Sequence, residues 1–139
     1  MNLLGALLVT PKLRKIRLSI RSFLCNLRSE HTIVFLKQVL KLGPGDIILL
    51  WDRHKIHISP QTQEFLNNHP RVHEYRFPVC APELNPVEFV WTQISEHTAG
   101  FAPHNIQELC DRVQAGIART RASKNSLLAC LKTADLSWK

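Results

Sequence analysis

The fold of this chain is decided by the stretch Asp46-Ile-Ile-Leu-Leu-Trp-Asp52-Arg-His-Lys-Ile-His57. Its five apolar residues, 47–51, run without a break and follow Gly43-Pro44-Gly45. A short apolar run bounded by turn residues is typical of a strand buried on both faces, although a buried helix segment gives the same pattern. Asp52 follows at the carboxyl end, where open α/β sheets bind their ligands. We therefore expect a functional carboxylate at Asp52; the alternative is an aspartate that caps the next helix.

Length and composition indicate a single soluble domain. The chain has 139 residues, enough for one domain with its own core, and its apolar fraction of 45% is that of a globular protein. No run reaches the ~18 apolar residues of a membrane span, and the apolar start lacks the basic residues of a signal peptide. The four cysteines are scattered, which favours a reducing cytoplasm over a disulfide or zinc framework. We expect a cytoplasmic protein with no membrane partner.

The net charge of +7 lies entirely in the first third of the chain. Residues 1–45 hold eight Lys or Arg and one acid, whereas the remaining residues hold ten of each sign. A basic segment of this kind favours a phosphate-rich partner such as a nucleic acid. A face that only keeps the protein soluble is the alternative.

The periodicity and the capping residues predict alternating strands and helices. An antiparallel hairpin is expected from strands at 3–9 and 12–24, and helix caps are expected at Ser29, Ser59, Asn85 and Asn105. The predicted helices cover about 30–42, 60–68, 86–100, 106–121 and 126–131, and the other predicted strands cover 47–51 and 72–77. This order predicts one α/β domain over 1–139, with its core at about 3–121.

A second stretch, Ala81-Pro-Glu-Leu-Asn85-Pro-Val-Glu88-Phe-Val-Trp91, carries another acid in a special place. Glu88 is the third residue of the helix that Asn85 caps. The pair also fits a capping box, in which the glutamate accepts a hydrogen bond from the N–H of the cap residue. The helix alone therefore favours a structural role for Glu88.

Taken together, the two stretches resemble the insertion-sequence transposases of the mariner superfamily, which are DDE enzymes with a ribonuclease-H-like fold. Trp51-Asp52-Arg53-x-x-x-His57 is similar to the segment with the second aspartate of that family. Pro82-Glu-Leu-Asn-Pro-x-Glu88 is similar to the segment with the third acid, and the 35 residues between the two acids match the family spacing. A weaker resemblance extends from Leu4 to about residue 121. It implies a ribonuclease-H-like mixed sheet with flanking helices.

This resemblance implies that Asp52 and Glu88 are catalytic acids that bind Mg²⁺ or Mn²⁺. Two such ions activate water and stabilise the leaving oxygen during phosphodiester cleavage, and hard cations prefer carboxylate ligands. The implied partners are transposon-end and target DNA, and the implied process is DNA transposition. Glu83 is the less favoured alternative to Glu88. Arg53 and His57 are expected to orient groups near the metal or to contact DNA phosphate, or else to be solvated side chains.

The resemblance fails at the start of the chain, because residues 1–45 contain no aspartate. The family's first catalytic aspartate lies on the first strand of its fold. We therefore expect a chain that lacks this strand and the preceding DNA-binding domain, and that is inactive alone. A missing N-terminal half, or a homo-oligomer, is the expected partner.

Two other functions remain open. The chain could bind DNA without cleaving it, through a basic hairpin that carries Arg14, Lys15, Arg17 and Arg21. It could also be an interaction module that pairs with an intact transposase through its sheet edge or the helix of Trp91.

Overall fold

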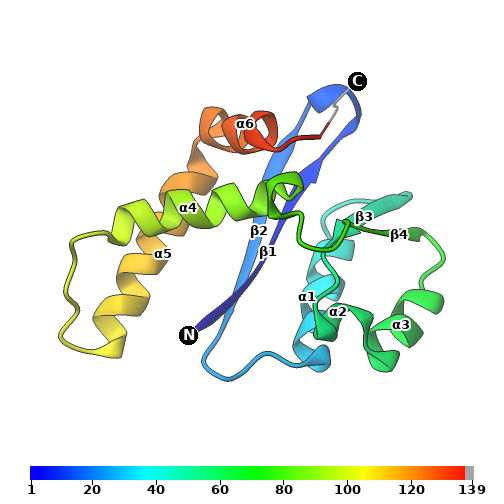
Figure 1. Ribbon diagram of the computed structural model, residues 1–139, viewed down its shortest axis with the longest axis horizontal. Coiled ribbons are helices and arrows are strands. Elements are labelled where there is room, and N and C mark those ends of the chain that lie inside the picture. Colours follow the sequence, from blue (N-terminus) through cyan, green and yellow to red (C-terminus); the bar gives the residue numbers. More distant parts are fainter. Residues whose placement is uncertain (137–139) are drawn as a thin grey trace. The chain divides into compact units, whose positions relative to one another are not determined.

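The computed structural model describes residues 1–136 and has a mixed α/β fold (Figure 1). The predicted architecture of strands with flanking helices is confirmed, and the strands form two separate two-stranded sheets, β1 with β2 and β3 with β4. The strands are β1 (Asn2–Val9), β2 (Ile16–Phe23), β3 (Ile47–Trp51) and β4 (Val72–Arg76). The helices are α1 (Ser29–Leu40), α2 (Lys55–Ile58), α3 (Pro60–Asn67), α4 (Pro86–Thr98), α5 (Ile106–Ala122) and α6 (Lys124–Thr133).

The chain divides into two compact units. The first unit comprises residues 1–4 and 21–81, and the described part of the second comprises residues 5–20 and 82–136. The first unit therefore holds α1 to α3 with β3 and β4, and the second holds α4 to α6. The β1–β2 hairpin contributes residues to both.

The hairpin forms as predicted, but its second strand starts later than the sequence pattern suggests. Lys12 and Leu13 have φ values of 58° and 53°, in the left-handed region, so an extended strand cannot include them. Thr10 closes the turn: its N–H donates to the carbonyl oxygen of Lys15 at 3.0 Å, and its hydroxyl oxygen accepts the Lys15 N–H at 2.8 Å. The strand expected from residue 12 therefore begins at Ile16.

In the first unit, β3 and β4 run parallel, from Ile47 opposite Val72 to Trp51 opposite Arg76. Parallel pairing requires a crossover, which α2 and α3 supply. The core of this unit consists of Leu36 from α1, Trp51 from β3 and Leu66 from α3, with partly buried neighbours at Leu49, Phe65 and Val72. This packing fixes the end of β3, and with it the backbone that leads into Asp52.

The prediction that β3 is buried on both faces is wrong. Ile48 is 70% exposed and Leu50 is 44% exposed, whereas Trp51 is buried. Successive strand residues point to opposite sides, and the described residues of α1 and α3 pack against the side of Leu49 and Trp51. An uninterrupted apolar run therefore does not by itself show that both faces of a strand are covered.

The helix cap predicted at Ser29 is also wrong by one residue. Ser29 is the first residue of α1, and Arg28 is its cap. The N–H of Arg28 donates to Nδ1 of His31 at 2.9 Å. A histidine side chain thus takes the part that a capping box usually gives to glutamate or glutamine.

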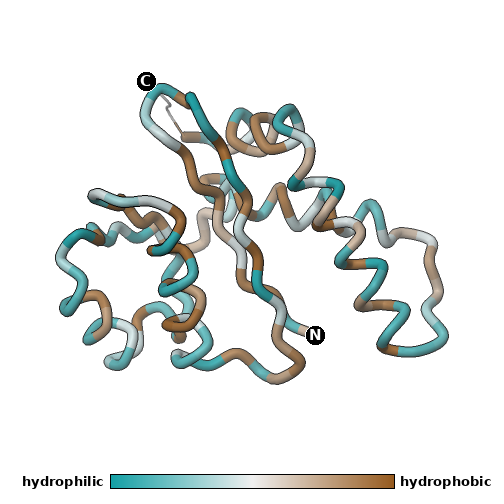
Figure 2. Tube along the Cα trace, turned by 180° about the vertical axis from the view of Figure 1, so that it is seen from behind, coloured by the Kyte–Doolittle hydropathy of each residue, from teal (hydrophilic) through white to brown (hydrophobic). Residues whose placement is uncertain are grey.

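The second unit is built around the buried side of α4. Val90 and Ile94 of α4, Ile117 of α5, and Leu127 and Leu131 of α6 are all buried. Hydrophilic and hydrophobic residues alternate along α5 in Figure 2, as expected for a helix with one covered side. The predicted caps Asn85 and Asn105 are confirmed, since their side chains accept the N–H groups of Val87 and Glu108.

Gly5 of β1 allows the indole of Trp91 to lie against the strand. A Cβ atom at Gly5 would lie 2.5 Å from Cη2 and 2.8 Å from Cζ2 of Trp91. Real Cβ atoms do not approach other atoms this closely, so any other residue at this position would displace the ring. This contact anchors the middle of α4, three residues after Glu88.

None of the helices in residues 1–136 has both the length and the apolar character that crossing a membrane requires.

Candidate functional site

Asp52 follows the last residue of β3, as the sequence predicts, and its carboxylate is held at one oxygen. Oδ1 of Asp52 accepts the N–H of His54 at 3.0 Å and lies 2.7 Å from Nδ1 of His57. The side chain is 54% exposed, and within residues 1–136 no hydrogen bond reaches Oδ2. One oxygen is therefore fixed by the protein, while the other has no partner among the described residues and is available to a cation.

His57 is brought to Asp52 by α2, a four-residue helix that the sequence analysis did not predict. Its ring stacks on the indole of Trp51, with 4.3 Å between ring centroids and 7° between ring planes. Burial lowers the pKa of His57, although the Asp52 carboxylate acts in the opposite direction. An ionised carboxylate only accepts hydrogen bonds, so the neutral ring carries its proton on Nδ1 and donates to Asp52.

Glu74 of β4 is hydrogen-bonded to Trp51, on which His57 stacks, and it was not predicted from the sequence. Its Oε1 accepts three hydrogen bonds, from Nε of Arg76 at 2.8 Å, Nε1 of Trp51 at 3.0 Å and Nε2 of Gln63 at 3.3 Å. Burial raises the pKa of Glu74, but the bonds from Arg76, Trp51 and Gln63 together lower it below its ordinary value. The sequence shows only that Glu74 lies inside a short predicted strand, and this position does not reveal which side chains it contacts.

Arg53 is exposed, and it donates from Nε to the carbonyl oxygen of Phe77 at 3.2 Å. This bond holds the guanidinium near the ends of both strands of the parallel pair, because Phe77 follows β4 and its N–H donates to Trp51. The terminal nitrogens of Arg53 make no hydrogen bond within the described residues. They are available to an anion such as phosphate.

Glu88 lies on the first turn of α4 in the second unit, and the capping box considered for it does not form. The N–H of Asn85 donates to the carbonyl oxygen of Pro82 at 3.0 Å. The Glu88 carboxylate is exposed and has no hydrogen-bond or ion-pair partner among residues 1–136. Glu88 therefore does not serve as the capping-box residue of α4.

Glu83, the alternative acid, is also exposed, in a 3-10 turn over Pro82–Leu84. Its carbonyl oxygen accepts the N–H of Asp135 at 3.0 Å, while its carboxylate has no partner in the described part of the chain. Local geometry therefore does not separate Glu83 from Glu88. Asp52 belongs to the first unit and both glutamates belong to the second.

Carboxylate oxygens such as those of Asp52 and Glu88 suit a hard divalent cation. Residues 1–136 contain no preformed group of three or more His, Cys, Asp or Glu side chains that could hold a metal ion.

The four basic residues predicted to contact DNA from the hairpin are all exposed. Arg14 and Lys15 lie in the turn, and Arg17 and Arg21 lie on β2. Arg17 and Arg21 are four residues apart, which is two full periods of a strand. Nη1 of Arg21 donates to Oε1 of Gln38 at 3.3 Å, and its guanidinium lies 5.8 Å from the ring of Phe23. Arg14, Lys15 and Arg17 belong to the second unit and Arg21 to the first.

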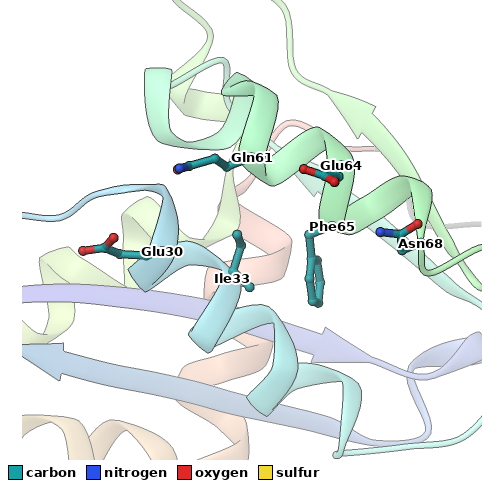
Figure 3. Close-up of a pocket in the computed structure, with 6 residues that line it drawn as sticks. All are labelled: Glu30, Ile33, Gln61, Glu64, Phe65 and Asn68. Carbon is teal, nitrogen blue, oxygen red and sulfur yellow. The ribbon is translucent and has the colours of Figure 1, made fainter.

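A shallow cavity of about 330 Å³ lies between α1 and α3 of the first unit. Figure 3 shows Ile33 and Phe65 reaching into it, with carboxylates at Glu30 and Glu64. Neither Asp52 nor Glu88 lines this cavity, and its two glutamates are not part of any group of three or more possible metal ligands among the described residues. The exposed end of β3, rather than a closed pocket, is therefore the candidate site.

A comparison with protein families matches residues 6–110 to the family model for DDE superfamily endonucleases. The match includes Asp52, Glu83 and Glu88. A search of curated proteins found no match.

Proposed function

Since this chain belongs to the DDE superfamily of endonucleases, we propose that it is the DNA-cleaving domain of a transposase, of the insertion-sequence type related to mariner. Asp52 and Glu88 are its metal-binding catalytic acids, and residues 1–139 act together as one catalytic domain. Its substrates are transposon ends and target DNA.

The observation that carries this proposal is the arrangement at Asp52. A half-exposed carboxylate at the end of a strand has one oxygen held by the protein and the other without a partner among the described residues. A purely structural aspartate at a helix start would be expected to use its side chain to cap the helix, but the cap of α2 is His54. Asp52 therefore fits the role of a metal ligand better than that of a cap.

Bound Mg²⁺ or Mn²⁺ would supply an activated water and a stabilised leaving oxygen for phosphodiester cleavage. Asp52 and Glu88 hold the metal in this proposal, with Glu83 as the alternative to Glu88. Arg53 provides a cation at the same end of β3 for a DNA phosphate. The neutral Nδ1–H form of His57 favours orientation of Asp52 over contact with phosphate, because its Nε2 has no proton to donate.

The proposed site contains two acids, Asp52 and Glu88. With no aspartate in residues 1–45, two acids would hold metal ions weakly. We therefore expect little or no cleavage by this chain alone, and we expect a partner chain to supply the third carboxylate.

Binding of Mn²⁺ followed by water-proton relaxation, together with nicking of supercoiled plasmid, tests this proposal. Asp52→Ala and Glu88→Ala should each weaken Mn²⁺ binding by about tenfold or more, and Glu64→Ala, an exposed acid of α3, should leave it unchanged. Equal binding by all three variants would overturn the metal assignment. Strong loss with Glu83→Ala and none with Glu88→Ala would move the third acid to Glu83.

A second candidate function is DNA binding without cleavage, favoured by the exposed side chains of Arg14, Lys15, Arg17 and Arg21. Replacing any one of them by alanine should reduce the slope of log binding constant against log salt by about one unit, if that residue contacts a phosphate. Steeply salt-dependent DNA binding without any effect of Mn²⁺, or of Asp52→Ala, would support this function over the first.

A further inference from the structure

We propose that Glu74 is a positioning residue for the Asp52 carboxylate, and that it acts through Trp51 and His57. This inference rests on the proposed function, because it gives Asp52 the role of a metal ligand. All the residues concerned belong to the first unit.

The first step is the fixed position of the Glu74 carboxylate. Its side chain is only 16% exposed, and Oε1 accepts hydrogen bonds from Arg76, Trp51 and Gln63. Burial removes water from the carboxylate, and each of these hydrogen bonds offsets part of the lost hydration, so the carboxylate is stable only in this position. The hydrogen bond from Nε1 of Trp51 to Glu74 fixes the orientation of the indole ring.

The second step is the stack between Trp51 and His57. Trp51 is buried in one hydrophobic cluster with Leu36 and Leu66, and the imidazole stacks on its indole with a 7° angle between ring planes. Gln63 also connects Glu74 with His57, since its Nε2 donates both to Oε1 of Glu74 and to the carbonyl oxygen of His57, the latter at 3.2 Å. The plane of the imidazole therefore follows the plane of the indole.

The third step is the bond from His57 to Asp52. With the ring plane set, Nδ1–H points at Oδ1 of Asp52 over 2.7 Å, and the N–H of His54 reaches the same oxygen. Both contacts restrict the rotamer of Asp52 and leave Oδ2 without a partner among the described residues. Groups behind a metal ligand commonly set its orientation in this way and change metal affinity when they are removed.

The alternative is that Glu74 only satisfies the buried indole N–H and stabilises the β3–β4 pair. Stability alone does not separate the two roles, because both predict a loss when Glu74 is removed. The proton position on His57 does separate them, because it changes only if the effect reaches the ring beside Asp52.

The test uses the ¹⁵N-labelled chain and three variants, Glu74→Ala, Trp51→Phe and the control Glu64→Ala. Long-range ¹H–¹⁵N correlation spectra report the tautomer of His57 without metal, and relaxation titration reports Mn²⁺ affinity. Trp51→Phe keeps an aromatic ring under His57 but lacks the N–H that Glu74 accepts, so it tests the link even if Glu74→Ala does not fold.

We expect both variants to shift His57 from the Nδ1–H form to a mixture of tautomers and to weaken Mn²⁺ binding by about tenfold. Glu64→Ala should change neither. Unchanged tautomer and unchanged affinity in both variants would overturn the role of Glu74, while a loss of Mn²⁺ binding in Asp52→Ala would leave the proposed function standing. If Mn²⁺ binding does not depend on Asp52, the proposed function fails, and the tautomer alone decides whether Glu74 acts on His57.

Discussion

The two acids proposed to bind metal differ in what holds them. Asp52 is bonded to a backbone N–H and to a histidine, and that histidine rests on a tryptophan whose indole is fixed by Glu74. Glu88 stands on an exposed helix turn with no side-chain partner among the described residues. The position of Asp52 thus depends on residues up to 22 positions away in sequence, whereas that of Glu88 depends on where α4 begins and how it is anchored.

The largest expected effect concerns the anchoring of α4. Gly5→Ala should destabilise the second unit by about 2 kcal/mol, because the new Cβ would overlap the Trp91 ring. Gly116→Ala in α5 is the control, since its Cβ would meet Cβ of His97 at 3.4 Å and alanine suits a helix. Amide hydrogen exchange in α4 measures both changes. Equal protection in the two variants would show that Trp91 moves aside without cost.

The next effect contrasts the two acids directly. Asp52→Ala should destabilise the first unit by about 1.5 kcal/mol, because it removes the acceptor of two hydrogen bonds. Glu88→Ala should change stability by less than about 0.5 kcal/mol, since only a favourable interaction with the helix terminus is lost. Urea unfolding followed by exchange in β3 and α4 measures the two values. If they are equal, the contrast drawn between the acids is wrong.

The start of α4 sets the place of Glu88, and Asn85→Ala tests it. The side chain of Asn85 accepts the Val87 N–H at 3.2 Å, and its loss should destabilise the helix start by about 1 kcal/mol. Asn85→Asp should retain most of that stability, because aspartate also caps helices well. Faster exchange confined to the first turn of α4 is the expected measurement. No change at that turn would mean that the Pro82–Leu84 turn alone fixes the helix start.

The smallest expected effect is a pH dependence of stability that arises from Glu74, in the hydrogen-bond network behind Asp52. The pKa of Glu74 lies below its ordinary value of 4.5 in the fold, so Glu74 contributes stability that is complete above that value. This contribution is lost as pH falls through the lowered pKa, when the carboxylate becomes protonated. Stability measured between neutral and acidic pH should therefore fall less steeply in Glu74→Gln than in the unmodified chain. Identical slopes would show that Glu74 does not contribute.

The sequence by itself determined the order of the four strands and of every helix except the short α2, most of the helix starts and the family. Ser59, Asn85 and Asn105 were identified correctly as caps, because a cap bonds to an N–H only two or three residues away. Such short-range chemistry is visible in any local stretch. The two motifs around Asp52 and Glu88 were sufficient to identify a DDE endonuclease, in agreement with the family match over residues 6–110.

Only the tertiary structure decided what surrounds the candidate acids. The exposure of Ile48, the stack of His57 on Trp51 and the bond from Trp51 to Glu74 depend on the helix face that covers β3 and on the register between β3 and β4. Glu74 lies opposite Leu49, and no local pattern specifies that pairing. The physical reason is that a carboxylate gains hydrogen-bond partners from whichever segments fold beside it, and these segments are brought together by burial of apolar surface rather than by sequence spacing.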